Sequence, residues 1–138
     1  MVQRKTASGC KKVGKSMTAR PKFQYVRSNR LMRAYRMIPC QNCGAFDNTI
    51  CGAHSNWAEH GKGKSIKASD HYAASMCAKC HHQLDQGKDL SEQERREMWS
   101  KAHAKTFREL LARGLWPVDV PFPEIDTSFL EGLSYGYS

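Results

Sequence analysis

The sequence has 138 residues, of which 22 are Lys or Arg and 13 are Asp or Glu, so its formal charge is +9. This length predicts one compact domain with tails, and the charge favours polyanionic partners, nucleic acid above all. No apolar run approaches the roughly 20 residues of a membrane span, and no apolar segment follows the N-terminal charges as in a secretory signal. We therefore expect no membrane insertion and a cytoplasmic location, in which cysteines rarely pair as disulfides.

The charge is distributed unevenly. Residues 1–36 carry 11 Lys or Arg and no acid, whereas residues 37–138 carry 11 basic and 13 acidic residues. Residues 1–20, rich in Lys, Ser and Gly, are predicted to form a disordered basic arm that follows DNA phosphates. Residues 115–138 contain four acids, no Lys or Arg and three of the five prolines. We expect them to be an acidic tail, a candidate contact for a protein partner, with the domain itself at residues 21–114.

The domain begins with short elements. In chain order, the pattern predicts a strand at residues 22–27, a short basic helix at 29–36 and a second strand at 49–54. A Gly- and Lys-rich loop at 57–69 and a short helix at 81–86, ended by Gly87, follow. The strongest local pattern follows. Ser91 with Glu94 makes a capping box, apolar residues recur at helical spacing from Met98 to Leu111, and Gly114 ends the predicted helix. The apolar face of this helix is expected to be core.

Two Cys-x2-Cys pairs, Cys40 with Cys43 and Cys77 with Cys80, are separated by 33 residues. A two-residue spacer allows one turn to direct both sulfurs at a single ion, and four thiolates suit a closed tetrahedral Zn²⁺ site. The sequence therefore predicts a structural zinc ion. Cys51 has no partner at this spacing and is expected to be a small buried residue.

Alternative roles for these cysteines fit the pattern less well. Residues 77–81 (CAKCH) match a haem-attachment pattern, but such attachment requires export and leaves the first pair unexplained. A zinc nucleoside deaminase needs H-x-E before P-C-x-x-C, whereas Pro39 precedes the first pair and no Glu follows His54 at the required position. Free or redox-active thiols are the remaining alternative.

A second set of residues lies around the cysteine pairs. His81 and Asp85 are four residues apart on the predicted helix, so they share a face and supply half of a divalent-metal site with open positions. His54, at the end of a predicted strand, can face the same ion. A neutral His beside a cation suits phosphodiester hydrolysis.

The order of these motifs resembles the HNH nucleases, also called ββα-metal or His-Me finger enzymes. More narrowly, it is similar to small HNH proteins of phages and prophages, including the recombination-enhancing kind. The resemblance covers roughly residues 38–87 and rests on Cys40-x2-Cys43, Ala53-His54, Gly61-x-Gly63, Lys67-x2-Asp70 and Cys77-x2-Cys80-His81-x3-Asp85.

The resemblance implies an α+β fold: a treble-clef zinc domain with a ββα-metal core and an added C-terminal helix. It implies that His54 is the general base and that His81 and Asp85 bind a catalytic divalent metal, Mg²⁺ or Mn²⁺. The loop-bracing Asn of the family has no direct counterpart, and Asp70 or Asn56 could replace it.

One departure from the family concerns the metal. Many relatives have an acidic or His ligand just before the base, where this chain has Ala53. His54 itself, His60 or His71 could complete the coordination instead, although His60 and His71 are otherwise expected to be solvated loop residues. His82 and His103 are expected at the surface. Lys64 and Lys67, with Lys62, are candidate phosphate contacts or simply a solvated loop.

The sequence thus favours a metal-dependent DNA endonuclease, acting in DNA recombination or processing in a bacterial or phage-infected cell. A non-catalytic zinc-dependent nucleic-acid-binding protein would share the same basic arm and zinc staple. A third possibility is an interaction module that docks onto a replication or recombination protein through its acidic tail.

Overall fold

The computed structural model describes residues 24–129, so the predicted basic arm at residues 1–20 lies outside the described residues. The elements are three helices, a two-stranded sheet and two short 3-10 turns: α1 (Asn29–Tyr35), β1 (Cys51–His54), η3 (Ala58–His60), β2 (Ala73–Met76), α2 (Ala78–Gln86), α3 (Glu92–Ala112) and η4 (Thr127–Phe129). The architecture is therefore α+β, as predicted. No helix among residues 24–129 has the length and apolar character needed to cross a membrane.

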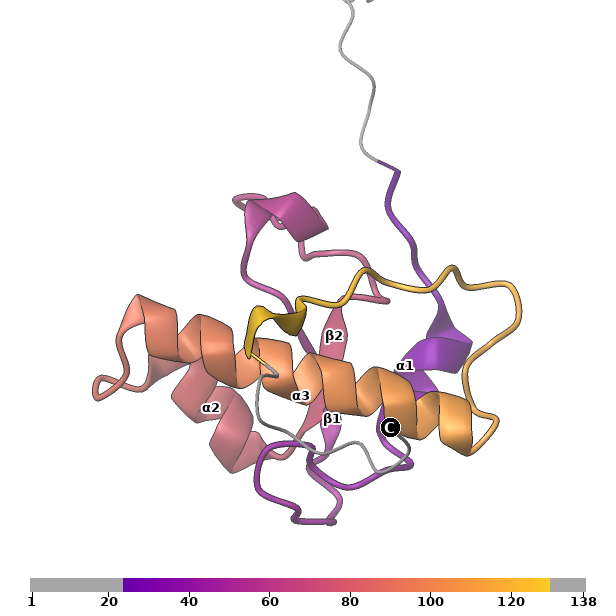
Figure 1. Ribbon diagram of the computed structural model, residues 1–138, viewed down its shortest axis with the longest axis horizontal. Helices are drawn as coiled ribbons and strands as arrows, with labels where there is room; N and C mark the ends of the chain where they lie inside the picture. The colour runs from indigo at the N-terminus through magenta and orange to yellow at the C-terminus, as the bar shows by residue number, and fades with distance from the viewer. Residues whose placement is uncertain (1–23, 130–138) are drawn as a thin grey trace, which may run out of the picture.

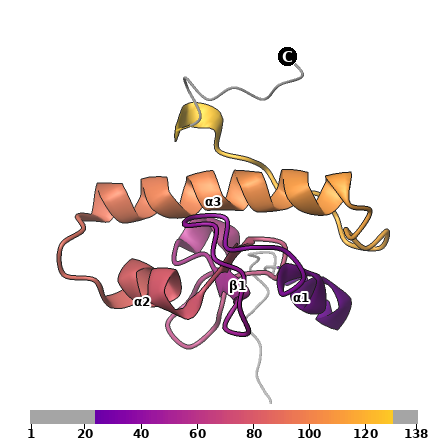
Figure 2. The same ribbon diagram turned by 90° about the horizontal axis from the view of Figure 1, so that it is seen from below.

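Helix α3 is the longest element, and α2, the sheet and α1 all lie on the same side of it (Figures 1 and 2). The predicted capping box is present, because the Ser91 hydroxyl accepts the Glu94 N–H at 3.1 Å and the Glu94 carboxylate accepts the Ser91 N–H at 2.8 Å. Gly114, with φ at +69°, follows the end of the helix. Both predicted boundaries of this helix are confirmed.

Strands β1 and β2 pair antiparallel, with Cys51 opposite Met76 and His54 opposite Ala73. The sequence predicted β1 but not β2, whose residues (AASM) show no alternation because all four are buried. Thr106 of α3 joins the helix to the sheet. Its Oγ1 donates to the Ala102 carbonyl and accepts the Ser75 N–H at 3.0 Å, which satisfies a backbone group of β2 that has no strand partner.

Side chains alternate along a strand, so the two faces of the sheet carry different residues. One face, with Ala53 and Met76, joins the first core cluster, which also contains Leu84 of α2 and Trp99 of α3. The other face, with Ala73, joins the second cluster. This cluster is built from α1, the end of α3 and the segments that follow these helices: Leu31, Ala34, Tyr35, Ile38, Leu110 and Val120. The hairpin therefore separates two small cores.

The strand predicted at residues 22–27 is absent from the described part of that segment, residues 24–27. Val26 does form two bonds to the loop before β2: its N–H donates to the Ser69 hydroxyl at 3.0 Å and its carbonyl accepts the Asp70 N–H at 2.8 Å. One of these partners is a side chain, so the pattern does not continue as a backbone ladder. Helix α1, predicted at residues 29–36, is confirmed, and the Ser28 hydroxyl caps it by accepting the Leu31 N–H.

The chain beyond α3 turns back along that helix (Figure 1). Pro117, Val120 and Pro123 are buried, and the Glu124 N–H donates to the Tyr72 hydroxyl at 2.9 Å. Residues 115–129, which the sequence assigned to an acidic tail, thus contact the loop before β2 as well as α3. Residues 130–138 of that tail lie outside the described residues.

Gly52 of β1 provides a test of this arrangement. A Cβ atom at this position would lie 2.6 Å from Cδ2 of the buried Tyr35 ring, closer than packed atoms approach. We expect Gly52→Ala to lower the free energy of unfolding by about 1–3 kcal/mol, because Tyr35 cannot move without disturbing α1. Gly63→Ala is the matched control, since its Cβ would meet Ile66 at an ordinary 3.6 Å. Equal stability of both variants in urea denaturation would contradict the packing described.

Candidate functional site

Cys40, Cys43, Cys77 and Cys80 converge, with all four sulfur atoms within 4.8 Å of one another. The Cys43 and Cys77 sulfurs are 3.7 Å apart. Sulfurs bound to one tetrahedral Zn²⁺ at about 2.3 Å lie about 3.8 Å from each other. The cluster therefore has the donor chemistry and spacing of a structural zinc site.

Local structure explains the convergence. The first pair lies in a tight turn closed by the Gly44 N–H on the Cys40 carbonyl, and Gly44 adopts the left-handed φ of +87° that this turn requires. The turn is joined to β2 by a bond from the Gln41 N–H to the Ser75 carbonyl at 2.8 Å. The second pair lies where α2 begins, so β2 leads directly from the sheet into the cluster.

The surroundings of the sulfurs act differently on individual thiols of the cluster. Burial raises the pKa of the Cys40 thiol, but backbone N–H groups, from Cys43 first, outweigh burial and lower the pKa to about 7. Burial and the neighbouring thiols raise the pKa of Cys80 to about 12, against the opposing hydrogen bond from Asn42. Four thiolates this close repel one another unless a cation neutralises them, so metal binding and loss of the thiol protons are linked.

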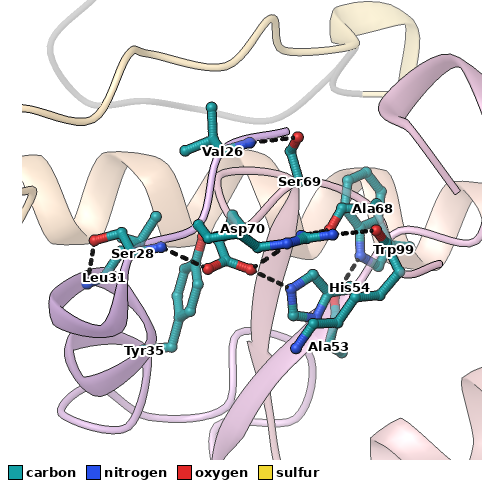
Figure 3. Close-up of polar contacts among 12 residues, drawn as sticks. Val26, Ser28, Leu31, Tyr35, Ala53, His54, Ala68, Ser69, Asp70 and Trp99 are labelled. Carbon is teal, nitrogen blue, oxygen red and sulfur yellow. Dashed lines mark hydrogen bonds and ion pairs between the residues drawn. The ribbon is translucent and has the colours of Figure 1, made fainter. Parts of the chain in front are cut away.

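A second group centres on Asp70, a buried carboxylate in the loop before β2 (Figure 3). It accepts the Ser28 N–H at 2.7 Å and lies 2.9 Å from Nε2 of His54 and 3.4 Å from the Arg27 guanidinium. The Asp70 carbonyl also accepts the Tyr35 hydroxyl at 2.6 Å. Asp70 therefore ties the start of α1 to the end of β1.

The Asp70 carboxylate also determines the state of His54. A carboxylate only accepts hydrogen bonds, so Nε2 of His54 carries the proton and Nδ1 is left as the acceptor. Burial lowers the pKa of His54, and the positive charges of Lys67 and Arg27 add to that effect against the attraction of Asp70. The imidazole is thus oriented and neutral near pH 7, which are the properties of a general base.

A third group lies on α2. Nε2 of His81 is 3.2 Å from the Asp85 carboxylate, and Nδ1 of His81 is 3.6 Å from the Cys51 sulfur on β1. Asn56, two residues after His54, donates to the other Asp85 oxygen at 3.2 Å. The His81 and Asp85 side chains are 33% and 39% exposed, so solvent and ligands can reach both.

The structure does not join His54 to the His81–Asp85 pair in one ion site. Within residues 24–129, the four cysteines form the one group of three or more His, Cys, Asp or Glu side chains that could hold a metal. The strand register gives the reason, because Cys51 and His54 are three residues apart and point to opposite faces of the hairpin. Ala53, the position before His54, is fully buried and offers no ligand.

The two predicted lysine contacts differ. Lys67 is exposed and close enough to His54 to lower its pKa, while its carbonyl accepts the Arg27 guanidinium at 2.8 Å. Lys64 is also exposed, and its side chain forms no ion pair or hydrogen bond with residues 24–129. Lys67 is therefore the lysine that the structure brings to the His54 site.

The remaining histidines correct part of the sequence interpretation. His82 is exposed, as predicted, but His103 is buried rather than at the surface. Its Nε2–H donates to the His71 carbonyl at 3.0 Å, and its ring stacks on Trp99 with centroids 4.5 Å apart. His60 is half-buried, with its ring stacked on Tyr72 at 4.2 Å. His60 and His71 are thus parts of the packing around α3 rather than solvated loop residues.

Four residues of these groups were not expected to take part: Arg27, Ser28 and Tyr35 beside Asp70, and Cys51 beside His81. The cap of α1 was the available signal for Ser28, because a Ser before a basic helical segment commonly satisfies its first N–H groups. Nothing in the sequence pattern indicates the contacts of Arg27 or Cys51. The chain matches no protein-family model, and no curated protein or solved structure matches it either.

The cysteine cluster predicts one Zn²⁺ per chain. Metal binding supplies folding free energy in sites of this kind, so Cys77→Ser should lose the zinc and unfold the domain. Zinc content by elemental analysis and circular dichroism would measure both effects. Cys51→Ser is the matched control, since its sulfur lies outside the cluster. Purified protein without zinc, or equal zinc loss in both variants, would contradict the assignment.

His103 predicts acid sensitivity. Burial lowers its pKa from 6.5 to about 4, so between these values the unfolded chain binds a proton that the folded chain excludes. The free energy of unfolding should therefore fall as the pH falls through this window, by up to about 1.4 kcal/mol per pH unit. His103→Gln removes this titration while its amide can still donate to the His71 carbonyl.

Urea denaturation at pH 7 and pH 5 would test this effect. We expect the wild type to lose about 1–2 kcal/mol more than His103→Gln between these pH values. Proton uptake by the cysteines is common to both proteins and cancels in the comparison. Identical losses would show that His103 does not contribute.

Proposed function

We propose that this protein is a metal-dependent DNA endonuclease of the HNH type, in which His54 is the general base. The observation that carries the proposal is the hydrogen bond of 2.9 Å between His54 and the buried Asp70 carboxylate. It leaves an oriented, neutral imidazole with one free acceptor nitrogen. The order β1, β2, α2, with cysteine pairs on either side of the hairpin, supports a treble-clef domain with a ββα core.

The base needs a nucleophile to activate. Nδ1 of His54 would accept a proton from a water molecule as that water attacks the scissile phosphorus, and Asp70 would stabilise the imidazolium that forms. Lys67 and Arg27 place positive charge beside the same imidazole, where a phosphate would lie. These charges favour phosphate binding and keep the base deprotonated until the reaction begins.

His81 and Asp85 are the residues that would hold a divalent cation, Mg²⁺ or Mn²⁺. Neighbouring ligands of an octahedral ion with bonds of about 2.1 Å lie about 3.0 Å apart. The 3.2 Å between Nε2 of His81 and the Asp85 oxygen fits two such positions, and their exposure leaves the others to water and phosphate. When bound, the cation would neutralise charge at the scissile phosphate and leaving oxygen.

A second candidate is a zinc-stabilised nucleic-acid-binding protein without catalysis. It is favoured by the absence, within residues 24–129, of a three-ligand metal group other than the cysteines. Both candidates place DNA as the partner and the cytoplasm of a bacterial or phage-infected cell as the location, with DNA recombination or processing as the setting. The His54–Asp70 pair favours the endonuclease, because binding alone has no use for an oriented neutral base.

Plasmid nicking by purified protein with Mg²⁺ or Mn²⁺ separates the two candidates. We expect His54→Ala and His81→Ala each to reduce nicking at least about 100-fold, the size of effect general acid–base groups commonly have. Zinc content and circular dichroism should stay unchanged, since neither residue belongs to the cysteine cluster.

The matched control is His82→Ala, which removes the exposed neighbour of His81 on the same helix and should nick at the wild-type rate. Wild-type protein that binds DNA but never cuts it would favour the non-catalytic candidate. Wild-type rates in both His54→Ala and His81→Ala would overturn the assigned roles.

A further inference from the structure

A groove of about 380 Å³ lies between α1 and the turn that follows α3. Arg30 and Arg33 of α1 line one side, and Met37, Trp116 and Val118 are among the residues that line the rest. Both arginines are exposed, Met37 is 53% exposed and Val118 is 93% exposed. The groove thus combines two cations with apolar surface, and both are open to solvent.

The two guanidinium groups have no counter-ion of their own. Within residues 24–129, neither forms an ion pair or a side-chain hydrogen bond, and α1 contains no acid. Asp119, the nearest acid along the turn, does not pair with either arginine. Arg30 and Arg33 are three residues apart, so they lie on the same side of the helix. Their charge is therefore available to an anionic ligand.

The aromatic part of the groove, Trp116, is held in a fixed position. The Trp116 indole N–H donates to the Val120 carbonyl at 3.0 Å, and its ring packs edge-on against Phe107 with centroids 4.9 Å apart. A preformed aromatic and aliphatic surface beside paired cations suits a ligand that carries a flat apolar ring on an anionic chain. A nucleotide with an unstacked base has this chemistry, and duplex DNA, whose bases are stacked inside, does not.

The position of the groove relative to His54 supports a nucleic-acid strand. Asp70 holds both the His54 ring and the N–H of Ser28, which caps α1. From Ser28 to Arg33 the helix rises about 7.5 Å. A stacked duplex strand covers this length in about two phosphate steps at 3.4 Å each, and an extended single strand covers it in fewer. A strand at His54 could therefore continue along α1 into the groove.

We propose that this groove binds single-stranded DNA, with phosphates at Arg30 and Arg33 and an unstacked base against Met37, Trp116 and Val118. The inference rests on the proposed function in one respect, namely that the polyanion is DNA. It adds that the protein prefers a single-stranded segment, such as a gap, flap or displaced strand, beside the bond presented to His54.

The test is fluorescence anisotropy with the full, zinc-loaded chain and no added Mg²⁺, so that binding is measured without cleavage. The probes are labelled oligo-dT and a duplex of the same length, titrated over a range of salt concentrations. Arg30→Gln/Arg33→Gln should weaken oligo-dT binding at least about tenfold at low salt. It should also reduce the salt slope by about 1.4, because each phosphate contact on a single strand contributes about 0.7.

Two further variants make the test specific. Lys88→Gln/Lys101→Gln removes the same net charge from the α2–α3 connection and α3, and should change oligo-dT affinity by less than the arginine variant does. Val118→Asp places a carboxylate on the apolar side of the groove. The variant should fold as the wild type does, because Val118 is 93% exposed. It should weaken oligo-dT binding more than duplex binding.

Three results would overturn the inference. The first is that the arginine and lysine variants weaken oligo-dT binding equally, and the second is that Val118→Asp weakens oligo-dT and duplex binding equally. The third is that poly-glutamate at matched charge concentration displaces oligo-dT. The outcomes for groove and catalysis are separable. Arginine-dependent oligo-dT binding without any nicking would retain the groove and reject the endonuclease. Nicking that depends on His54, with unchanged oligo-dT binding in the arginine variant, would retain the endonuclease and reject the groove.

Discussion

The convergence of four sulfur atoms on one point is the constraint on which the rest of the structure depends. The hairpin between the two cysteine pairs has strands of only four residues each, and an isolated hairpin of this size is marginal in water. The cluster joins the turn before β1 to the start of α2, directly after β2. The direction of α2, and with it the exposed His81–Asp85 pair, follows from how the cysteines meet.

Asp70 makes the second long-range connection, and its chemistry explains why it can be buried. Removing a carboxylate from water is costly unless hydrogen bonds and charges replace the solvent. Here the Ser28 N–H, His54 and Arg27 do so. The same residue thus fixes α1 against β1 and orients the imidazole. A substitution of Asp70 would therefore affect both the stability of the fold and the orientation of His54. A substitution of His54 itself tests the proposed chemistry more directly.

The parts of the fold that local patterns determine were predictable from the sequence. The cysteine pairs and the caps of α3 depend on residues a few positions apart, and the structure contains both. Strand β2 was missed because a strand buried on both faces and built from Ala, Ser and Met has no alternation to detect. His103 was placed at the surface because its helix was expected to have an exposed far side. The loop before β2 packs against His103 through the His71 carbonyl and the Tyr72 ring, and contacts so distant in sequence leave no local signal.

The two faces of the hairpin define how the proposed reaction would be arranged. His54 points to the face shared with Tyr35 and α1, while Cys51 points to the other face, where it contacts His81 of α2. A base and a cation on opposite faces can act on one phosphodiester only at the rim, where β1 ends. The bond between Asn56 and Asp85 lies at that rim and ties the chain just after His54 to α2. This short connection therefore links the two groups, and Asn56 is one of the two residues that the family resemblance offered as a brace for this loop.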